Sequence, residues 1–389
     1  MAVEGLVLVS RKGEARILRG HPWVFRSDIA RARDAGQGAL VRVANEREKP
    51  LGFALYSSRS EIRLRMIARG DALPADWLRQ RLRAAVAWRR EIAAEASACR
   101  LVHGEGDLLP SLVVDRYADY LAIQTLSQGM ERLKSEIVAT LVEELRPRGI
   151  LERNDPRVRV LEGLEQKVSL LHGEVPERLD ITEGERVLEA DLWRGQKTGL
   201  FLDQRENHLM TRAYARGRVL DGFTYAGGFA LQAAAVAQSV LAVDLSAEAL
   251  GLVKQNAARN GITNIETRDA NVFDLLRELD DAGEVFDTLI LDPPAFAKSK
   301  DAVEKAQRGY KEINLRALKI LRPGGILITC SCSYHVHEAE FEQILASAAA
   351  DAGALVSVVE KRRQARDHPI VLGVPETYYL KCFVLRKLG

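Results

Sequence analysis

The stretch that decides the fold reads VLDGFTYAGGF and covers residues 219–229. Its apolar start is typical of a buried strand, and the glycines that follow separate this strand from a helical pattern. Gly227 and Gly228 let the backbone pass close to a ligand at the carboxyl end of a strand, although many glycine-rich turns are only turns. The run lacks the G-x-G-x-x-G spacing of dinucleotide-binding turns, and the chain has no P-loop lysine motif. The pattern therefore predicts the first strand–turn–helix unit of an open α/β sheet.

Strand-like and helical segments alternate from about residue 185, which is typical of a doubly wound sheet. Residues 355–360 and 378–385 predict a closing antiparallel hairpin. The expected fold class is thus α/β, with a Rossmann-like domain built on a seven-stranded sheet over residues 185–389. The other predicted strands cover residues 218–220, 240–243, 265–268, 288–291 and 326–330, and the helices cover residues 228–237, 247–260 and 303–321.

Two further domains are predicted before residue 185. Residues 1–72 contain short strands punctuated by glycine, which favours a small β-barrel. Residues 73–184 are expected to form a central α+β domain. It begins with a long arginine-rich helix over residues 74–98. The remaining elements predicted before residue 185 are strands at residues 7–9, 39–43, 51–56 and 62–67, a hairpin of residues 112–117 and 120–124, and a helix over residues 130–145.

The composition is that of a globular protein without membrane-spanning segments. Of the 389 residues, 47% are hydrophobic and 28% are charged, and no apolar run approaches the roughly 20 residues of a transmembrane helix. The start of the chain lacks the pattern of a signal peptide. Four cysteines are too few and too unevenly placed for a disulfide framework or a zinc site. We therefore expect a cytoplasmic protein with free thiols and no metal.

Two basic clusters stand out although the net charge is only +2. Such clusters often contact phosphates, but each is equally well explained as a solvated helix face. The clusters consist of Arg11, Lys12, Arg16 and Arg19, and of Arg79, Arg81, Arg83, Arg89 and Arg90.

Polar residues follow the predicted strands in an order that indicates a cofactor. Asp221 ends the first strand, and Asp244 follows about 20 residues later, where a carboxylate suits a ribose diol. Asn271, at the end of the third strand, is suited to the edge of an adenine. Each feature alone is weak. Together with Asp292-Pro293-Pro294 and residues 323–325 (PGG), their order resembles that of the methyltransferases that use S-adenosylmethionine (SAM).

The fourth strand ends in Asp292, followed by Pro293-Pro294-Ala295-Phe296. Two prolines fix φ and therefore the direction of the aspartate. In methyltransferases generally, an acidic or amide residue before two prolines binds an amino group on a planar base. We expect Pro293, Pro294 and Phe296 to contact that base. This motif does not separate methylation of nitrogen from methylation of carbon.

The fifth strand ends in TCSCS, residues 329–333, and offers a nucleophile. Carbon 5 of cytosine is a poor nucleophile, and a thiolate that adds at carbon 6 activates it. A strand cysteine is more often a small buried hydrophobe, an interpretation that suits Cys330. Cys332 stands where the strand runs into a loop, which favours a catalytic role beside Asp292.

Six further stretches carry a resemblance that covers nearly the whole chain. On these motifs the chain resembles the bacterial large-subunit (23S) ribosomal RNA cytosine-5 methyltransferases, class I SAM-dependent enzymes with an N-terminal RNA-binding PUA domain. The first two stretches look like the PUA portion, and the last two are the most specific. The stretches are GHPWVF (20–25), LGFALY (51–56), ILERND (150–155), KTGLFLDQR (197–205), GYKEIN (309–314) and SCS (331–333).

The resemblance implies SAM as cofactor, ribosomal RNA as partner and Cys332 as the nucleophile. It also implies that Phe201, Gln204 and Arg205 close over the cofactor, although Arg205 is equally explained by a structural salt bridge. The expected cofactor pocket comprises Phe201, Gln204, Arg205, Asp221, Phe223, Tyr225, Gly227, Asp244, Leu245, Asn271, Val272 and Asp292.

One departure concerns the proton on carbon 5. Many RNA cytosine-5 methyltransferases carry a second cysteine after Pro-Pro, where this chain has Ala295; the resembling family shares that absence. The base that removes the proton is therefore unidentified. His335, His337 and Lys298 lie nearby in sequence, although loop residues of these types are usually only solvated.

Three alternatives remain open from the sequence. An amine methyltransferase, for instance for guanine N2, would use Asp292 and dispense with Cys332. A non-catalytic RNA assembly factor would require a broken cofactor pocket. A small-molecule methyltransferase would leave about 180 residues of RNA-binding architecture without a purpose. A symmetric homodimer is a reasonable expectation, and access to carbon 6 implies an unpaired or flipped base.

Overall fold

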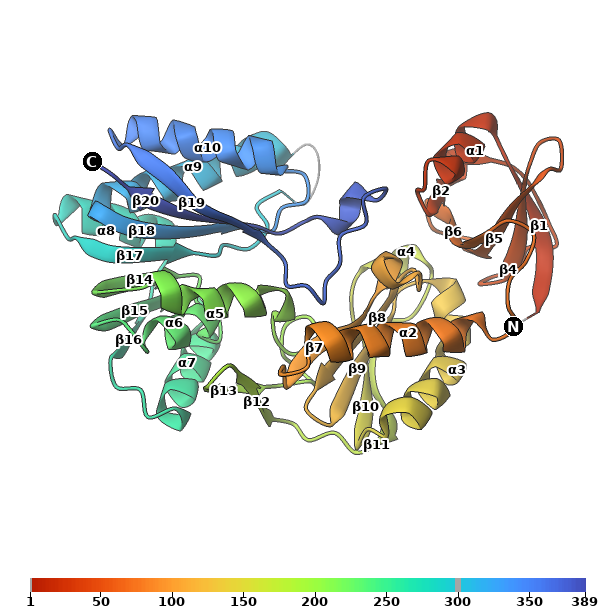
Figure 1. Ribbon diagram of the computed structural model, residues 1–389, viewed down its shortest axis with the longest axis horizontal. Coiled ribbons are helices and arrows are strands. Elements are labelled where there is room, and N and C mark those ends of the chain that lie inside the picture. The colour runs from red at the N-terminus through yellow and green to blue at the C-terminus, as the bar shows by residue number, and fades with distance from the viewer. Residues whose placement is uncertain (1, 298–301) are drawn as a thin grey trace. The chain divides into compact units, whose positions relative to one another are not determined.

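The computed structural model describes residues 2–297 and 302–389. The chain divides into two compact units (Figure 1). The first comprises Met1–Ile181, Ala190–Leu202 and Arg366–Thr377, and the second comprises Thr182–Glu189, Asp203–Ala365 and Tyr378–Gly389. The chain enters the second unit along β12 (Leu179–Glu183) and returns to the first along β13 (Arg186–Ala190), which form a two-stranded sheet, and it enters the second unit again after Leu202.

A six-stranded sheet in the order β2-β6-β5-β4-β1-β3 begins the first unit. β1 and β4 are parallel, and the other neighbouring pairs are antiparallel. Apolar residues of β4 alternate toward a core that includes Val41 and Val43, as a half-buried strand requires. The elements are β1 (Val3–Val9), α1 (Arg11–Leu18), β2 (Trp23–Phe25), β3 (Ile29–Arg33), β4 (Leu40–Asn45), β5 (Pro50–Tyr56) and β6 (Ile62–Arg69).

A five-stranded sheet in the order β11-β10-β9-β8-β7 follows in the same unit. The predicted long helix is α2, but it ends at Ile92 rather than at residue 98. The reason is that Ala93 leaves the helical backbone and Ala98 enters β7, whose apolar residues pair with β8 and are buried. The elements are α2 (Trp77–Ile92), β7 (Ala98–His103), β8 (Leu112–Tyr117), β9 (Tyr120–Thr125), α3 (Gln128–Leu145), β10 (Gly149–Asn154), α4 (Val158–Leu161) and β11 (Lys167–Gly173).

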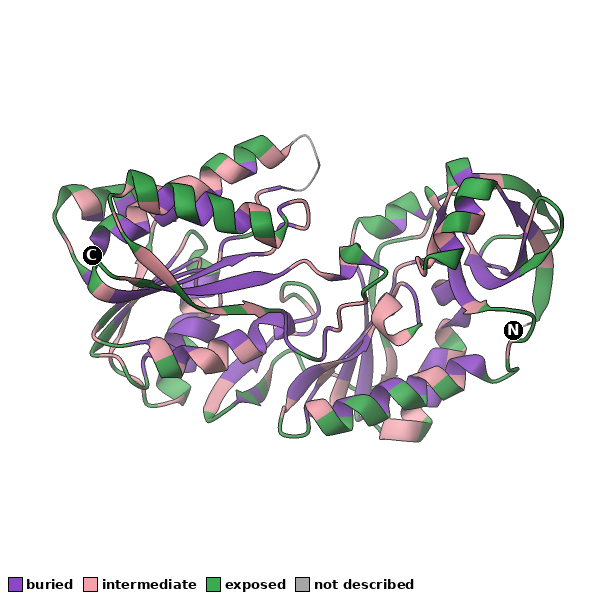
Figure 2. Ribbon diagram, turned by 45° about the horizontal axis from the view of Figure 1, so that its top comes forward, coloured by how far each residue is buried: buried purple, intermediate pink, exposed green. Residues whose placement is uncertain are grey.

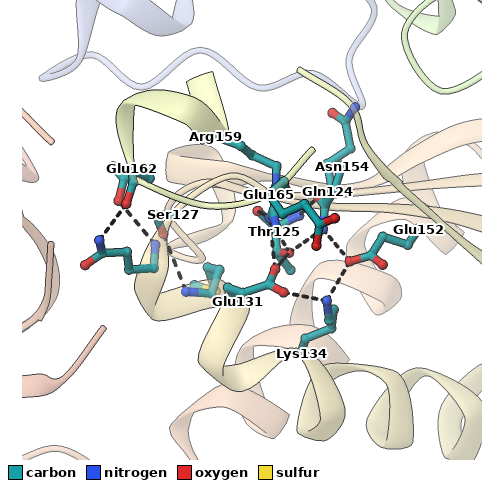
Figure 3. A network of polar contacts seen from close by, with 12 residues as sticks. Gln124, Thr125, Ser127, Glu131, Lys134, Glu152, Asn154, Arg159, Glu162 and Glu165 are labelled. Atoms are coloured by element: carbon teal, nitrogen blue, oxygen red, sulfur yellow. Dashed lines mark hydrogen bonds and ion pairs between the residues drawn. The ribbon is translucent and has the colours of Figure 1, made fainter. Parts of the chain in front are cut away.

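A buried polar network joins the elements of the first unit (Figure 3). Arg159 Nη1 donates to Glu131 at 2.9 Å, and Lys134 bridges Glu131 and Glu152 with two contacts of 2.6 Å. Burial raises the pKa of Glu131, but its hydrogen bonds to these cations prevail and hold the pKa at about 2. The carboxylate therefore stays ionised and ties α3 to β10 and α4.

The second unit contains a seven-stranded sheet in the order β16-β15-β14-β17-β18-β20-β19. The predicted closing hairpin is present, because β20 is antiparallel to both β18 and β19. The elements are α5 (Arg205–Tyr214), β14 (Arg218–Gly222), α6 (Gly228–Ala233), β15 (Ser239–Asp244), α7 (Ala247–Arg259), β16 (Ile265–Asp269), α8 (Val272–Asp281), β17 (Phe286–Leu291), α9 (Val303–Ile320), β18 (Leu321–Ser331), α10 (Glu338–Asp351), β19 (Val356–Arg363) and β20 (Lys381–Lys387).

The central strands of this sheet are buried on both faces (Figure 2). Leu220 and Leu289 pack with α8, α9 and α10 on one face, whereas Val219 and Ile290 pack with α6 on the other. Consistent with this, all six residues of β17 are buried, and its last three are consecutive apolar residues. Within residues 2–297 and 302–389, no helix has the length and apolar character needed to cross a membrane.

Candidate active site

Two acidic residues lie at the switch point of the seven-stranded sheet, where the strand order reverses between β14 and β17. Asp221 is the penultimate residue of β14, and Asp292 directly follows β17. The backbone N–H of Asp292 donates to the carbonyl of Gly222 at 3.4 Å. Open α/β sheets bind ligands outside the carboxyl ends of their strands at this point. The structure thus brings two predicted site residues to the edge where a ligand is expected.

The turn between β14 and α6 has an unusual backbone. Phe223 and Tyr225 have φ of 68° and 49°, which is costly for residues with a side chain, and Gly227 has φ of 86°. The turn is fixed against the neighbouring strand, because the N–H of Thr224 donates to the carbonyl of Val243 at 3.0 Å. A conformation of this kind is typical of a loop shaped around a ligand.

Asp244 lies beside this turn with its carboxylate held by two backbone N–H groups. Tyr225 donates to Oδ2 and Ser246 donates to Oδ1, each at 3.0 Å. The two hydrogen bonds fix the direction of the carboxylate, whose remaining lone pairs can still accept hydrogen bonds from a diol. The adjacent Leu245 is exposed and can cover a ligand plane.

Asn271 precedes α8 and acts as its N-cap. Its side-chain oxygen accepts the N–H of Phe273 at 2.9 Å, which leaves the side-chain NH₂ as the group that can donate to a ligand. The next residue, Val272, is buried and packs in the core that α8 shares with α9.

Asp221 is fully buried, so a charge on its carboxyl group is costly. Burial raises the pKa of Asp221 to about 7, and the neighbouring Asp292 adds to the rise. A hydrogen bond of 2.6 Å from the hydroxyl of Thr224 and the charge of His208 act in the opposite direction. A ligand that brings a positive charge to this place would stabilise the carboxylate.

His208 in α5 also belongs to this site, although the sequence interpretation gave it no role. Burial lowers the pKa of His208, but Glu183, 2.8 Å from Nδ1, together with Asp292 and Asp221, raises it overall. The ring lies so close to Gly228 that an added Cβ would be 2.3 Å from it. The position of a histidine within a helix offers no local signal of such a contact.

The two cysteines of the TCSCS stretch have different surroundings. Cys330 is fully buried in the core opposite Cys382, and burial raises the pKa of its thiol. Cys332 lies one residue beyond the end of β18 and is partly exposed. Its Sγ is 3.7 Å from the carbonyl oxygen of Pro293. The thiol that can meet a ligand beside Asp292 is therefore that of Cys332.

Ser333 joins the Cys332 segment to its neighbours, another contribution that the sequence did not reveal. Its Oγ lies 2.9 Å from the hydroxyl of Tyr310 in α9 and accepts the N–H of Ala297 at 3.2 Å. Its carbonyl accepts a hydrogen bond of 2.7 Å from Lys381 Nζ in β20. Tyr310 lies within the GYKEIN stretch. That motif was the only part of these Ser333 contacts that the sequence indicated.

The residues after Asp292 begin an aromatic row. Pro293 is buried and Pro294 is exposed. The ring centroid of Phe296 lies 4.6 Å from that of Tyr310 and 5.7 Å from that of Phe273. The apolar contacts suit one side of a pocket for a planar ring.

The remaining predicted cofactor contacts divide between the two units. Gln204 and Arg205 are buried in the second unit, where Gln204 Oε1 accepts a hydrogen bond of 2.7 Å from Asn207. Arg205 Nη2 lies 3.9 Å from Glu206 Oε1, a long ion pair. Phe201 belongs to the first unit, where Lys197 Nζ lies 4.5 Å from its ring centroid. The roles of these residues toward a cofactor stay predictions.

The three candidates for the missing base give no clear assignment. His335 packs against Tyr334, with ring centroids 5.1 Å apart. His337 is exposed and precedes α10, where its N–H donates to Glu340 at 2.9 Å. Lys298 lies outside the described residues.

The arginines of α2 are largely used inside the protein. Arg89 is buried and paired with Asp107. Arg79 and Arg83 form ion pairs with glutamates of α3, and Arg81 donates to two backbone carbonyls. The interpretation of this cluster as a phosphate-binding surface therefore loses support. On α1, Arg11, Lys12 and Arg19 are exposed, and that cluster remains a candidate.

The strand order of the second unit, its antiparallel β20 and the acidic strand ends at the switch point define a class I methyltransferase fold. The chain belongs to the S-adenosylmethionine-dependent methyltransferase family, whose model matches residues 99–383, and a PUA-like domain model matches residues 7–69. The predicted fold class and family are therefore confirmed.

Known relatives extend over almost the whole chain. Ribosomal RNA large subunit methyltransferase I of Klebsiella pneumoniae strain 342 is 40% identical, with 97% of this chain and 98% of the relative covered. The protein of the same name from Tolumonas auensis is 39% identical, with 98% and 99% covered. A solved protein from Streptococcus mutans, described as a SAM-dependent methyltransferase, shares the fold, with a TM-score of 0.83, 21% identity, and 98% and 99% covered.

The residues at the switch point fit SAM, the cofactor of this family. The carboxylate of Asp244, which two backbone N–H groups hold in place, suits the ribose hydroxyls. The buried Asp221 suits the ammonium of the methionine part, because a cation offsets the cost of burying its charge. SAM supplies an electrophilic methyl group when it is bound.

Proposed function

We propose that this protein methylates carbon 5 of a cytosine in large-subunit ribosomal RNA through a covalent bond between Cys332 and the base. One observation carries the proposal. The partly exposed thiol of Cys332 lies beside the loop that follows Asp292, with Sγ 3.7 Å from the carbonyl oxygen of Pro293. The names of the relatives and the PUA-like domain support ribosomal RNA as the substrate.

The proposed chemistry begins with attack of the Cys332 thiolate on carbon 6. As the S–C6 bond forms, the electrons of the C5–C6 double bond shift toward C4 and those of the C4–N3 double bond move onto N3, which takes a proton from water. The resulting enamine makes carbon 5 nucleophilic. Carbon 5 then accepts the methyl group of SAM, with S-adenosylhomocysteine as the leaving group. Removal of the C5 proton by a base restores the C5–C6 double bond as the thiolate is eliminated from carbon 6. N3 then gives up its proton. Asp292 orients the exocyclic amine and N3 during the addition.

The proposal places constraints on the RNA. Carbon 6 is shielded by stacking in a duplex, so the target cytosine must be unpaired or flipped out. Pro293, Pro294 and Phe296 would then form one wall of the pocket for the extruded base. In this proposal residues 1–72 bind RNA, residues 73–184 form a central domain, and residues 185–389 carry the chemistry.

The test compares Cys332→Ala with Cys330→Ala, the matched control two residues earlier in the chain. Each variant is assayed for transfer of labelled methyl groups from SAM to ribosomal RNA, and the product nucleoside is identified by mass. We expect Cys332→Ala to abolish 5-methylcytidine while SAM binding survives. Cys330→Ala should retain the activity, because Cys330 lies in the core.

A second measurement probes the covalent bond directly. RNA that carries 5-fluorocytidine at the target should trap an enzyme–RNA adduct, because fluorine on carbon 5 cannot leave as a proton does. The adduct should form with Cys330→Ala and not with Cys332→Ala. Full activity of Cys332→Ala, or a methylated guanine as product, would instead establish the amine methyltransferase that uses Asp292 alone.

A further inference from the structure

Lys381 is a buried cation next to the segment that carries Cys332. It begins β20 and is 1% exposed, in a strand whose following four residues are also buried. It pairs with Ser331 across β18 and β20, so it lies at the level of the strand end from which Cys332 projects. Burying a lysine is costly, and a fully buried one is uncommon unless it has a specific partner.

The ammonium of Lys381 is anchored on both sides of the strand end. Nζ donates to the carbonyl of Ser333 at 2.7 Å and to the carbonyl of Tyr379 at 3.0 Å. An ammonium has three N–H donors, so these two bonds do not exhaust its capacity. The first bond holds the residue directly after Cys332, and through it the direction of the Cys332 side chain.

The electrostatics of this place couple the lysine to the thiol. Burial lowers the pKa of Lys381 to about 8, while the negative charge of Cys332, with Glu338 and Glu340, raises it. The coupling is reciprocal, since an ammonium that is favoured by a thiolate also favours that thiolate. Among the described residues, other charged or titratable groups near the pair include Tyr310 from α9, whose pKa the charge of Cys332 raises, Tyr379 and Cys382 beside Lys381 in the chain, and Arg363, which pairs with Lys381 across β19 and β20.

We propose that Lys381 is the positioning residue of the nucleophile: its buried ammonium aims Cys332 through the Ser333 carbonyl and favours the thiolate by its charge. The inference rests on the proposed function, in which Cys332 attacks the base. It assigns to β20, the strand antiparallel to β18, a part in preparing the thiolate of Cys332.

Lys387 provides a matched control at the other end of the same strand. Its Nζ donates to two carbonyls as well, those of Leu318 at 2.8 Å and Leu321 at 2.7 Å. Replacement of Lys387 therefore removes a lysine with the same kind of anchoring, at the amino end of β18 rather than beside Cys332.

The experiment measures the rate of alkylation of Cys332 by iodoacetamide against pH, with the modified peptide quantified by mass spectrometry. Lys381→Met should move the midpoint of the profile upward and slow alkylation at pH 7 about tenfold, which corresponds to one pKa unit. Lys387→Met should leave the profile unchanged. The kcat for RNA methylation should fall in Lys381→Met, while the KM for SAM stays the same. A profile for Lys381→Met equal to that of Lys387→Met would overturn the proposal.

Two further variants separate charge from folding. Lys381→Arg keeps a positive charge and donors, and Lys381→Gln keeps a donor without the charge. The proposal requires Lys381→Arg to retain the midpoint of the wild-type alkylation profile and Lys381→Gln to raise it. Equal midpoints in these two variants would refute the proposal even if Lys381→Met does not fold. The alkylation profile does not depend on the product. Failure of the proposed function, seen as activity in Cys332→Ala, is therefore distinguishable from failure of this inference.

Discussion

The hydroxyl of Tyr310 lies 2.9 Å from Oγ of Ser333, and this contact joins α9 to the segment that carries Cys332. The same Oγ accepts the backbone N–H of Ala297, in the loop that begins at Asp292. One buried hydroxyl thus links the two segments that the proposed chemistry requires side by side.

Ser333→Ala should therefore lower kcat for RNA methylation about tenfold or more while the affinity for SAM stays unchanged. Small displacements of reacting groups carry large rate penalties, and this substitution removes the side-chain hydrogen bonds from Ser333 to Ala297 and Tyr310. Steady-state kinetics with ribosomal RNA, together with calorimetry of SAM binding, measure both effects. Tyr310→Phe, which retains the contact of Ser333 with Ala297, should have the smaller effect. A wild-type kcat in Ser333→Ala would show that this hydroxyl does not align the site.

The arrangement of the second unit could be predicted from sequence because its signals are local. β17 ends in three apolar residues directly before Asp292, and the turn after β14 is marked by Gly227 and Gly228. In an open α/β sheet, residues at the carboxyl ends of the strands meet at one edge. Their order in the sequence therefore predicts which of them lie close together.

The residues that the sequence left unassigned act through distant contacts. His208 reaches the site from α5 and Lys381 reaches it from β20, and neither has a neighbour in sequence that indicates the role. Likewise, nothing in residues 190–202 or 366–377 shows that these segments belong to the first unit. Periodicity reveals which face of an element is buried, but not which distant side chain covers it.

The affinity for SAM should depend on pH through Asp221. The carboxyl group has a raised pKa of about 7 in the protein without cofactor, and it must be ionised to pair with the ammonium of SAM. Below pH 7 binding must displace a proton, so affinity should fall up to about tenfold per pH unit, from pH 7 toward pH 6, and level off above pH 8. Calorimetry in two buffers of different ionisation enthalpy measures both the affinity and the proton released.

The matched pair for this prediction is Asp221→Asn and Asp244→Asn. Both variants should bind SAM more weakly, but only Asp221→Asn should lose the dependence on pH, because the raised pKa of Asp221 is the source of that dependence. A slope that persists in Asp221→Asn would assign the titration to another group.

Gly228→Ala should destabilise the second unit and weaken SAM binding. An added Cβ would lie 2.3 Å from the ring of His208, which is itself fixed by Glu183, so α6 or the histidine must move. We expect a loss of about 1–3 kcal/mol in the free energy of unfolding, as is typical of overpacking. Gly251→Ala is the control, since it lies within α7 with nothing within 4 Å of the added Cβ. It should stabilise the protein by about 0.5–1 kcal/mol. Equal stability of the two variants, measured by chemical denaturation, would contradict the prediction.

Glu162 is the fully buried acceptor that ties the first sheet to α3 within the first unit. It accepts hydrogen bonds from Arg65 Nη2 at 2.8 Å and from the hydroxyl of Ser57 at 2.7 Å, while the backbone N–H of Gln128 lies 3.2 Å away. Arg65 is only 5% exposed, so removal of Glu162 leaves a buried guanidinium without its carboxylate.

Glu162→Ala should therefore lower the free energy of unfolding of the first unit by about 3–5 kcal/mol, the cost of breaking a buried ion pair from one side. Glu304→Ala removes the partner of Arg308 from an exposed pair at 2.9 Å and should change stability by less than about 1 kcal/mol. Because the penalty comes from the stranded cation rather than from the lost attraction, the double variant Arg65→Met with Glu162→Leu should recover much of the stability. Urea denaturation of the wild type, Glu162→Ala, Glu304→Ala and the double variant tests this reasoning. If the double variant is no more stable than Glu162→Ala, the hydrogen bonds to Ser57 and Gln128, rather than the ion pair, hold these elements together.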